Sequence, residues 1–234
     1  MTYTYEYPRP SVTVDCVIFG LNFDTNNLEI LMIRRGGEPY KGCLALPGGF
    51  VNMDESLETA ARRELMEETG VSVSYLEQLY TMGEPNRDPR CRVIGVSYFG
   101  LVKSCEHKAV GGDDATDAFW MPVKGVMDSG SILAFDHKTI IGIALKRLQD
   151  KIKYAPIGFN LLTETFTLDQ LCRLYESILG RSVDKRNFYK KILSMNILSE
   201  CGKEENVNHR PAKLYKFDVV AYTNAVANGF NFNI

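Results

Sequence analysis

The sequence predicts an α+β protein with two domains. Apolar runs at positions 12–19, 28–33 and 93–102 are typical of strands, and positions 56–69 and 137–151 repeat apolar residues at helical spacing. Pro156 and Gly158 then interrupt the second helical pattern, which places a boundary there. We therefore expect one domain over residues 1–153 and a second, smaller domain over residues 154–234.

The composition limits the class of protein. The chain has 234 residues, of which 45% are hydrophobic and 24% are charged, as expected of a globular protein with a sizeable core. Its apolar runs are far shorter than the roughly 20 residues of a membrane-spanning helix, which excludes a transmembrane protein. The first residues lack the basic flank and apolar stretch of a signal peptide, which favours a cytoplasmic protein. The six cysteines include no C-x-x-C pair and are expected to be free thiols.

The strongest signal in the first domain is the segment 49–71. Within its helical part, Glu64, Glu67 and Glu68 stand at positions i, i+3 and i+4, so their carboxylates lie on one side of the helix. That side is only about 40° from the apolar stripe that the helix should bury. A solvated cluster of charges would point away from this stripe.

Inward-facing carboxylates indicate a metal site. Such oxygen ligands suit Mg²⁺ or Mn²⁺, which would neutralise the acids and hold a phosphate oxygen. The pair Gly48 and Gly49 would let the backbone approach the same place. An ordinary charged surface helix is the usual explanation of a Glu-rich run, but it does not explain the spacing of the other polar residues and glycines in the segment.

The segment resembles the Nudix box, G-x5-E-x7-R-E-U-x-E-E-x-G-U with U an aliphatic residue, and every position is met between Gly49 and Val71. The resemblance implies the Nudix fold, a mixed sheet sandwiched by helices. It also implies hydrolysis of a nucleoside diphosphate linked to another group. Carried over to this sequence, it makes Glu64, Glu67 and Glu68 the metal ligands. The implied catalytic residues are Glu64, Glu68, Arg63 and Glu55, the last two orienting the helix.

The general base of such a hydrolysis stays open. Glu64 is one candidate, and Glu106, Asp113 and Asp114 in the loop 104–117 are others. Solvated surface charge is the simpler explanation of any one of these loop acids.

A proline-rich stretch follows at residues 83–92. Its three arginines, Arg87, Arg90 and Arg92, suit bidentate pairing with phosphates. Pairing with the neighbouring Glu84 and Asp88 would merely stabilise the loop, and the sequence leaves both interpretations open.

Two strings in this part of the chain are similar to segments of the Nudix subgroup that handles ADP-ribose and of its regulatory relatives. They are R-D-P-R at residues 87–90 and L-A-F-D-H at residues 133–137. The predicted substrate-binding residues are accordingly Gly48, Gly49, Arg87 and Arg90. His137 is expected to begin a helix and to have no catalytic part.

Two helices and a hairpin are expected in the second domain. Thr167 and Gln170 form a capping-box pair before one helix, which Gly180 ends. A second helix over residues 184–196 places Phe188, Ile192 and Met195 on one face, with Tyr189 at its edge. Two β-type runs, 197–201 and 214–217, enclose a polar loop. Residues 225–234 are expected to form a weakly ordered tail.

The second helix has a polar face made of Arg186, Asn187, Lys190, Lys191 and Ser194. Such a face is usually solvated surface. Its basic and amide groups also suit phosphates and base edges, and the loop 202–213 lies where a winged helix has its wing.

This arrangement resembles the C-terminal domain of Nudix-related transcriptional regulators, a group that includes repressors of NAD metabolism and regulators of arabinose use. The matching segments are 15–20, 156–162, 166–168, 184–188 and 210–217. The resemblance implies a homodimer that binds a palindromic operator in double-stranded DNA and responds to an ADP-ribose-like nucleotide or a pentose. The DNA-binding residues it implies are Lys185, Arg186, Asn187, Lys190, Lys191, Arg210 and Lys213.

Three functions remain compatible with these patterns. One is a metabolite-responsive regulator with the Nudix domain as sensor, and another is a plain Mg²⁺-dependent pyrophosphohydrolase whose second domain is only structural. The third combines both. We favour the regulator and leave residual hydrolysis open, because many such regulators have a degraded Nudix box and this one is complete. The effector, and whether DNA binding represses or activates, are not determined by the sequence.

The charge is unevenly distributed along the chain. The net charge of −2 divides into −4 over residues 1–153 and +2 over residues 154–234. Within residues 181–216, nine basic and four acidic residues give +5. A total near zero argues against a nucleic-acid partner, but this distribution predicts a modest, salt-sensitive affinity that a dimer would reinforce.

Overall fold

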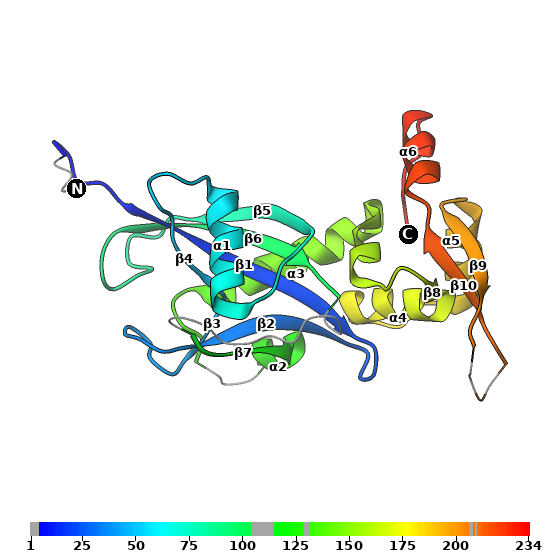
Figure 1. Cartoon of the computed structure of the whole chain (residues 1–234), viewed down its shortest axis with the longest axis horizontal. Helices are drawn as coiled ribbons and strands as arrows, with labels where there is room; N and C mark the ends of the chain where they lie inside the picture. Colours follow the sequence, from blue (N-terminus) through cyan, green and yellow to red (C-terminus); the bar gives the residue numbers. More distant parts are fainter. Residues whose placement is uncertain (1–4, 104–114, 129–131, 206–207, 209) are drawn as a thin grey trace. The chain divides into compact units, whose positions relative to one another are not determined.

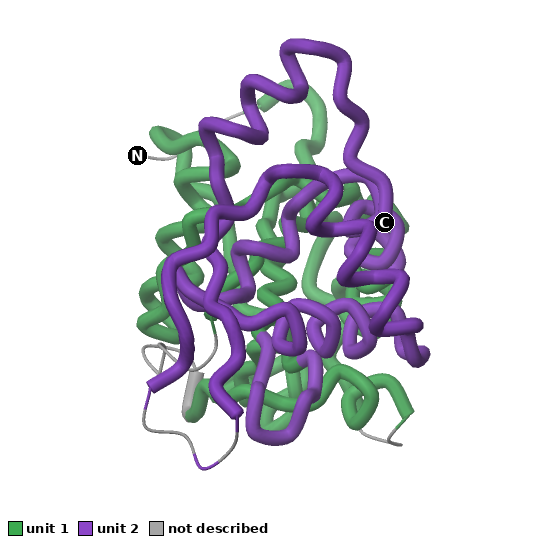
Figure 2. Tube along the Cα trace, turned by 90° about the vertical axis from the view of Figure 1, so that its right-hand side faces the viewer, with its two compact units in different colours: residues 1–20, 29–145 green, residues 21–28, 146–234 purple. Residues whose placement is uncertain are grey.

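The computed structural model describes residues 5–103, 115–128, 132–205, 208 and 210–234. These residues form two compact units (Figure 2). Unit 1 contains residues 1–20 and 29–145, and unit 2 contains residues 21–28 and 146–234. The domain boundary expected between residues 153 and 154 stays a prediction.

Unit 1 is built on a mixed sheet. Among the described residues the sheet has seven strands in the order β3-β2-β1-β6-β5, with β4 paired to β1 and β7 paired to β2. The central pair β1 and β6 is parallel, and the pairs with β3, β4, β5 and β7 are antiparallel. The strands are β1 (Ser11–Asn22), β2 (Asn27–Arg35), β3 (Leu44–Ala45), β4 (Gly48–Phe50), β5 (Tyr75–Met82), β6 (Val93–Leu101) and β7 (Ala115–Pro122).

Three helices accompany this sheet: α1 (Leu57–Thr69), α2 (Val123–Asp128) and α3 (His137–Tyr154). In Figure 1, α1 lies in front of the sheet, and the part of α3 that belongs to unit 1, residues 137–145, lies behind it. The buried face of α1, with Ala60, Ala61 and Leu65, packs on the β1 residues Val14 and Cys16 in one core cluster. Ser56 caps the helix start, and Gly70 in the left-handed conformation ends it. The expected α+β class and Nudix sandwich are thus confirmed.

Two eight-residue strands, β5 and β7, were not expected from the sequence, and neither were the short strands β3, β4 and β8. In β5, only Leu79 and Met82 are buried, so the strand shows no alternation of apolar and polar residues. It lies at one edge of the sheet and pairs only with β6, among the described strands. The other eight-residue strand, β7, has a buried Ala118 between polar and aromatic neighbours.

Unit 2 has the order of a winged helix. After a 3₁₀ helix (Pro156–Leu161) come β8 (Phe166–Thr167), α4 (Leu168–Leu179), α5 (Lys185–Ser194), β9 (Leu198–Lys203), β10 (Lys213–Phe217) and α6 (Val219–Ala227). The strands form an antiparallel sheet in the order β8-β10-β9. The predicted capping box is present: the Thr167 hydroxyl accepts from the Gln170 amide at 3.1 Å, and the Thr167 amide donates to the Gln170 side chain at 2.8 Å. The helix-turn-helix and wing are therefore confirmed.

The helical core of unit 2 follows the predicted faces. Phe188 and Ile192 of α5 are buried, Tyr189 is half-buried, and the polar side of the helix is exposed. The Phe188 ring packs against the ring of Tyr175 of α4, with 5.0 Å between the centroids. This ring contact joins α4 and α5 in the core of unit 2.

The expectation of a weakly ordered tail is wrong. Residues 219–227 form α6, Phe232 is only 4% exposed, and the amide of Ile234 donates to the carbonyl of Lys153 at 2.9 Å. The composition concealed this because the anchoring contacts come from residues distant in the sequence.

Two further findings concern the chain as a whole. No helix among the described residues is long and apolar enough to cross a membrane. The described cysteines, which are Cys16, Cys43, Cys91, Cys172 and Cys201, are free thiols.

Candidate functional site

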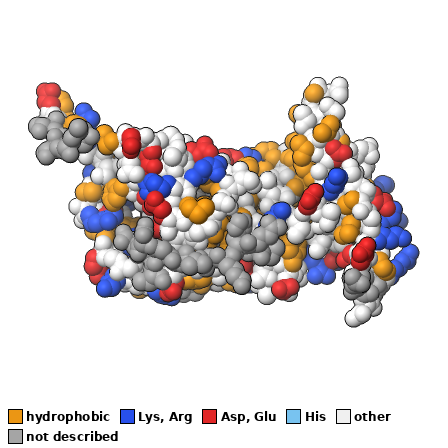
Figure 3. Space-filling model, viewed as in Figure 1, with side chains coloured by type: hydrophobic (Ala, Val, Ile, Leu, Met, Phe, Trp, Pro, Cys, Tyr) orange, Lys and Arg blue, Asp and Glu red, His pale blue; other side chains and the backbone are white. Residues whose placement is uncertain are grey.

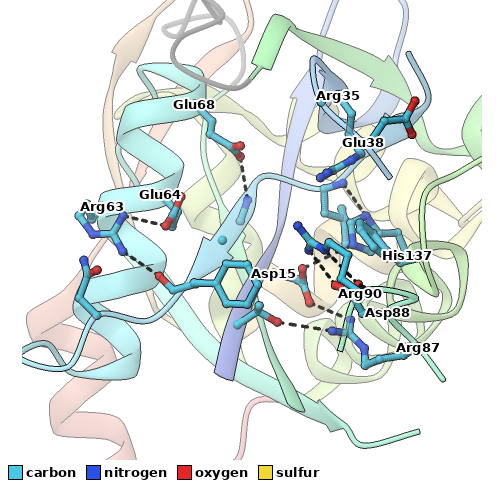
Figure 4. Close-up of a pocket in the computed structure, with 18 residues that line it drawn as sticks. Asp15, Arg35, Glu38, Arg63, Glu64, Glu68, Arg87, Asp88, Arg90 and His137 are labelled. Atoms are coloured by element: carbon cyan, nitrogen blue, oxygen red, sulfur yellow. Dashed lines mark hydrogen bonds and ion pairs between the residues drawn. The ribbon is translucent and has the colours of Figure 1, made fainter. Parts of the chain in front are cut away.

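A cavity of about 400 Å³ opens in unit 1 above the centre of the sheet. Its walls come from β1, β2, the β3–β4 turn, α1, the loop after β5 and the start of α3. Figure 4 shows how charged side chains of both signs converge on it. The charged residues and His137 that line it are Asp15, Arg35, Glu38, Arg63, Glu64, Glu68, Arg87, Asp88, Arg90 and His137.

The wall formed by α1 is organised by Arg63. Its guanidinium donates to both carboxylate oxygens of Glu55, at 2.6 and 3.0 Å, and also to Glu64 at 2.7 Å and to Glu67 at 2.9 Å. A further bond reaches the carbonyl of Phe50 at 3.1 Å. The hydrogen bonds from Arg63 lower the pKa of Glu55 to about 2. Burial raises the pKa of Glu64, although the Arg63 charge opposes this shift.

Strand β4 fits against the same helix through its two glycines. The amide of Gly48 donates to the Glu68 carboxylate at 2.8 Å, and the Glu64 carboxylate lies directly over Gly49. A Cβ on Gly49 would stand 2.5 Å from the Glu64 Oε1, and a Cβ on Gly48 would stand 2.1 Å from the Val14 carbonyl oxygen. Gly48 therefore requires glycine because the clash is with backbone, whereas a side chain at Gly49 would displace the Glu64 carboxylate.

The three predicted metal ligands, Glu64, Glu67 and Glu68, differ in their position relative to the cavity. Glu64 and Glu68 line the cavity, whereas Glu67 does not and its side chain is 43% exposed. No three His, Cys, Asp or Glu side chains among the residues that the structure describes are arranged to hold one metal ion. Arg63 binds Glu64 and Glu67, and a backbone amide binds Glu68, so the assignment of these three carboxylates as metal ligands stays a prediction.

The opposite wall contains a buried ionic network. Arg87, whose side chain is 4% exposed, donates to both oxygens of Asp136, at 2.7 and 2.9 Å, and to Asp15 at 3.1 Å. Burial alone would raise the pKa of Asp15, but the hydrogen bond from His137 and the charge of Arg87 lower it. A Cβ on Gly95 would stand 2.6 Å from the Arg87 guanidinium, so this glycine makes room for the network.

His137 has a larger part than the sequence indicated. It begins α3 as expected, but it is also buried and lines the cavity. Its Nδ1 accepts from the Leu46 amide at 2.9 Å, so a neutral ring carries its proton on Nε2, which lies 3.4 Å from the Asp15 carboxylate. Asp15 and Asp136 were also missed as members of the site. All three lie in segments that resemble the Nudix regulators, 15–20 and 133–137, but the resemblance assigned them no part in binding.

The cavity mouth is lined by arginines and aromatic rings. Arg90 pairs with Asp88 through bonds of 2.7 and 3.0 Å and lies 5.3 Å from the Phe50 centroid and 5.8 Å from the Phe135 centroid. The Arg35 guanidinium also lies over the Phe135 ring, 5.0 Å from its centroid. The site thus offers flat aromatic and guanidinium surfaces next to charged groups, which suits a ligand with both a ring and an anion.

In the loop of residues 83–92, the arginines stabilise the loop, and their pairing with phosphates stays a prediction. Arg87 holds the loop to Asp15 on β1 and to Asp136 just before α3, and Arg92 donates to the Glu84 carbonyl at 3.2 Å. Of the two arginines of this loop that line the cavity, Arg90 is the more accessible, with a side chain 41% exposed against 4% for Arg87. The other candidates for a general base, Glu106, Asp113 and Asp114, lie outside the described residues.

In unit 2, the predicted DNA-binding residues fall into two groups. Lys185 pairs with Asp169 at 2.6 Å, and Lys213 pairs with Glu200 at 2.8 Å. The others are exposed, and their side chains form no ion pair with any described residue; these are Arg186, Asn187, Lys190, Lys191 and Arg210. Figure 3 shows Lys and Arg side chains gathered around α5 and the neighbouring strands.

Two protein families match this chain, one in its first part and one in its second part. Residues 10–140 match the model of the NUDIX domain, and residues 158–217 match the model of the NrtR DNA-binding winged helix domain. The ADPR responsive transcriptional repressor NtrR of Acinetobacter baylyi is 34% identical in sequence, over 93% of this chain and 86% of that protein.

Two solved structures of Shewanella oneidensis NrtR are also similar. The one complexed with a 27mer DNA has a TM-score of 0.80 and 31% identity, over 95% of this chain and 99% of that one. The NUDIX domain complexed with ADP ribose has a TM-score of 0.55 and 35% identity, over 61% of this chain and 90% of that one.

Proposed function

Because the chain belongs to the Nudix family and carries an NrtR winged helix domain after its Nudix domain, we propose that it is a DNA-binding transcriptional regulator that senses a nucleotide of the ADP-ribose type. Its DNA partner would be a palindromic operator occupied by two copies of the chain. We place it accordingly in the cytoplasm, as the sequence predicts. We further propose that residues 1–153 sense the nucleotide and that residues 154–234 bind the DNA.

The exposed basic face of α5 carries this proposal. Arg186, Lys190 and Lys191 point outward from the second helix of a helix-turn-helix and form no ion pair with a described residue. Unpaired cations in that position suit the phosphates that flank a major groove, and Asn187 beside them suits a base edge. A helix that only supported a fold would gain nothing from holding these charges together.

The cavity of unit 1 supports the nucleotide. Its volume of about 400 Å³ is within the usual range for small-molecule sites. Arg90 and Arg35 can bind a diphosphate, and the rings of Phe50 and Phe135 can stack on a base. A pentose alone would use only part of this surface, so we favour the nucleotide over the sugar.

A mobility-shift experiment tests the regulator. The full chain is titrated onto DNA from the region upstream of its own gene, with and without ADP-ribose. We expect a salt-sensitive shift that ADP-ribose changes and that Lys190→Ala/Lys191→Ala abolishes. The matched control Lys124→Ala/Lys138→Ala removes two exposed lysines of unit 1 and should bind like the wild type.

The outcomes separate the parts of the proposal. No shift with the wild type, or equal loss in both double variants, would contradict the DNA-binding function. A shift that arabinose changes and ADP-ribose does not would contradict the nucleotide. Arg90→Ala should weaken the response to ADP-ribose while leaving the shift itself intact.

A second candidate is hydrolysis of an ADP-ribose-type substrate with Mg²⁺ or Mn²⁺. The observation in its favour is the complete Nudix box, with Glu64 and Glu68 lining the cavity. It requires Arg63 to release Glu64 and Glu67, since both are bound to its guanidinium. Release of AMP from ADP-ribose in the presence of Mg²⁺ should then occur with the wild type and not with Glu68→Gln. Equal turnover in both proteins, or none in either, would eliminate this candidate.

A further inference from the structure

The last helix of the chain turns its apolar face outward. In α6, the side chains of Val219, Val220 and Val226 are 61%, 71% and 47% exposed, and Thr223 and Ala227 are exposed beside them. At 100° per residue these five positions fall within about 120° of the helix circumference, so they form one continuous face. We call these five residues the α6 face. Figure 3 shows hydrophobic side chains along this helix.

The contacts of the other side hold α6 in this orientation. The Asp218 carboxylate caps the helix by accepting from the Ala221 amide at 2.8 Å, and it accepts from the Ser199 hydroxyl at 2.7 Å. The Tyr222 ring lies 5.6 Å from the Phe217 centroid and 6.4 Å from the Phe230 centroid. Beyond the helix, Phe232 is buried and Ile234 bonds to the backbone of α3, so both ends of the segment are anchored.

An exposed apolar face on so short a helix requires an explanation. A helix of nine residues is marginal in water without tertiary packing, and none of its residues is buried. Soluble proteins rarely expose contiguous apolar patches larger than a few hundred Å² unless a partner covers them. Residues 219–234 contain no Lys, Arg, Asp or Glu, although residues 181–216 carry a charge of +5.

We propose that the α6 face binds the α6 face of a second copy of this chain. An uncharged, apolar surface is complementary to itself, whereas a charged one would repel its own copy across a two-fold axis. The absence of cations also makes the face unsuited to DNA phosphates. Thr223 lies at the middle of the face and of the helix, so an antiparallel pair brings the two Thr223 side chains together at the axis.

The size of the contact sets its strength. The helix is about 14 Å long at 1.5 Å per residue, so a pair of them buries far less than the roughly 1,200 Å² of a stable interface. The α6 pair therefore acts together with other contacts between the two copies and fixes how the winged helices are paired. It needs neither DNA nor nucleotide, and the proposed function can fail without affecting it.

Disulfide trapping of the full chain tests the pairing. Thr223→Cys is oxidised under mild conditions without DNA, and covalent dimer is measured on a non-reducing gel against the wild type, whose exposed Cys91 and Cys201 give the background. We expect a covalent dimer well above this background. A yield equal to that of the wild type overturns the proposal.

A second experiment introduces a charge on the α6 face. Val220→Glu, added to Thr223→Cys, should lower the covalent dimer by about tenfold, because the contact would bury two unpaired carboxylates. Ile132→Glu is the matched control, since Ile132 is also 71% exposed and lies in unit 1. It should leave the yield unchanged. Undiminished dimer with Val220→Glu, or equal loss with both substitutions, shows that the α6 face has another occupant or none.

Discussion

Arg87 is a buried cation in the cavity wall opposite α1. It is the counter-charge of two carboxylates, Asp15 on β1 and Asp136 before α3, and its own side chain is 4% exposed. Buried ion pairs add little when compared with apolar residues, but removing one partner leaves the other charge without compensation. The network is therefore compatible with a stable fold only while all its charges are present.

Loss of Arg87 should consequently destabilise the protein. We expect Arg87→Ala to lower the free energy of unfolding by about 3–5 kcal/mol, since two acids lose their buried cation. Urea unfolding followed by circular dichroism measures this change. Arg92→Ala, which removes an exposed arginine of the same loop, should cost no more than about 0.5 kcal/mol. Similar losses in both variants would show that the network is not what holds the wall.

The same network predicts a pH dependence. The pKa of Asp15 in the folded state is lowered below its ordinary value of 3.8. A lowered folded pKa contributes stability above the ordinary pKa, and this contribution is lost as the pH falls through the folded value. Asp15→Asn should therefore destabilise the protein at pH 7, and the difference from the wild type should shrink below about pH 4. Urea unfolding at several pH values measures it. Asp24→Asn, in an exposed turn, should show no such trend.

At the scale of elements, the sequence predicted what is encoded locally. Helix α1 follows from spacing alone, and the start of α4 follows from Thr167 and Gln170. Strand β5 could not be predicted, because an edge strand buries too few side chains to alternate. The anchoring of residues 225–234 depends on contacts with distant residues, which leave no pattern in the sequence.

The candidate site divides in the same way. The α1 wall lies within one continuous segment, so its residues could be named in advance. The wall of Asp15, Arg87, Asp136 and His137 is assembled from three separate segments by the sheet, and only Arg87 had been singled out as a ligand-binding residue. The pairing of Arg63 with Glu64 and Glu67 was also not foreseen, because periodicity places side chains on a face but does not choose their partners.

The capping box of α4 gives a prediction at this scale. Thr167→Val keeps the shape of the side chain but removes the hydroxyl that accepts from the Gln170 amide at 3.1 Å. We expect a loss of about 1 kcal/mol in the free energy of unfolding. Thr165→Val, at an exposed position before the helix, is the control and should be nearly neutral. Thermal unfolding of both variants compares them, and no difference between the two would contradict the capping role.

For the whole molecule, the distribution of charge matters more than its total. The net charge is −2, yet residues 181–216 carry +5. Part of that charge is already neutralised within unit 2, since Lys185 binds Asp169 and Lys213 binds Glu200. The cations available to DNA are thus fewer than the sequence count, which predicts a moderate dependence of binding on salt.

The salt dependence should distinguish the two kinds of lysine. Each phosphate contact contributes about −0.9 to the slope of log K against log salt concentration. Lys190 is exposed without an ion pair among the described residues, so Lys190→Ala should reduce the magnitude of the slope by about 0.9 for each bound copy. Lys185 must first leave Asp169, so Lys185→Ala should change the slope less. Fluorescence anisotropy of labelled operator DNA between 50 and 200 mM salt, as an order-of-magnitude range, measures both slopes. Equal changes in the two variants would mean that DNA breaks the Lys185–Asp169 pair, and no change with Lys190→Ala would remove α5 from the DNA interface.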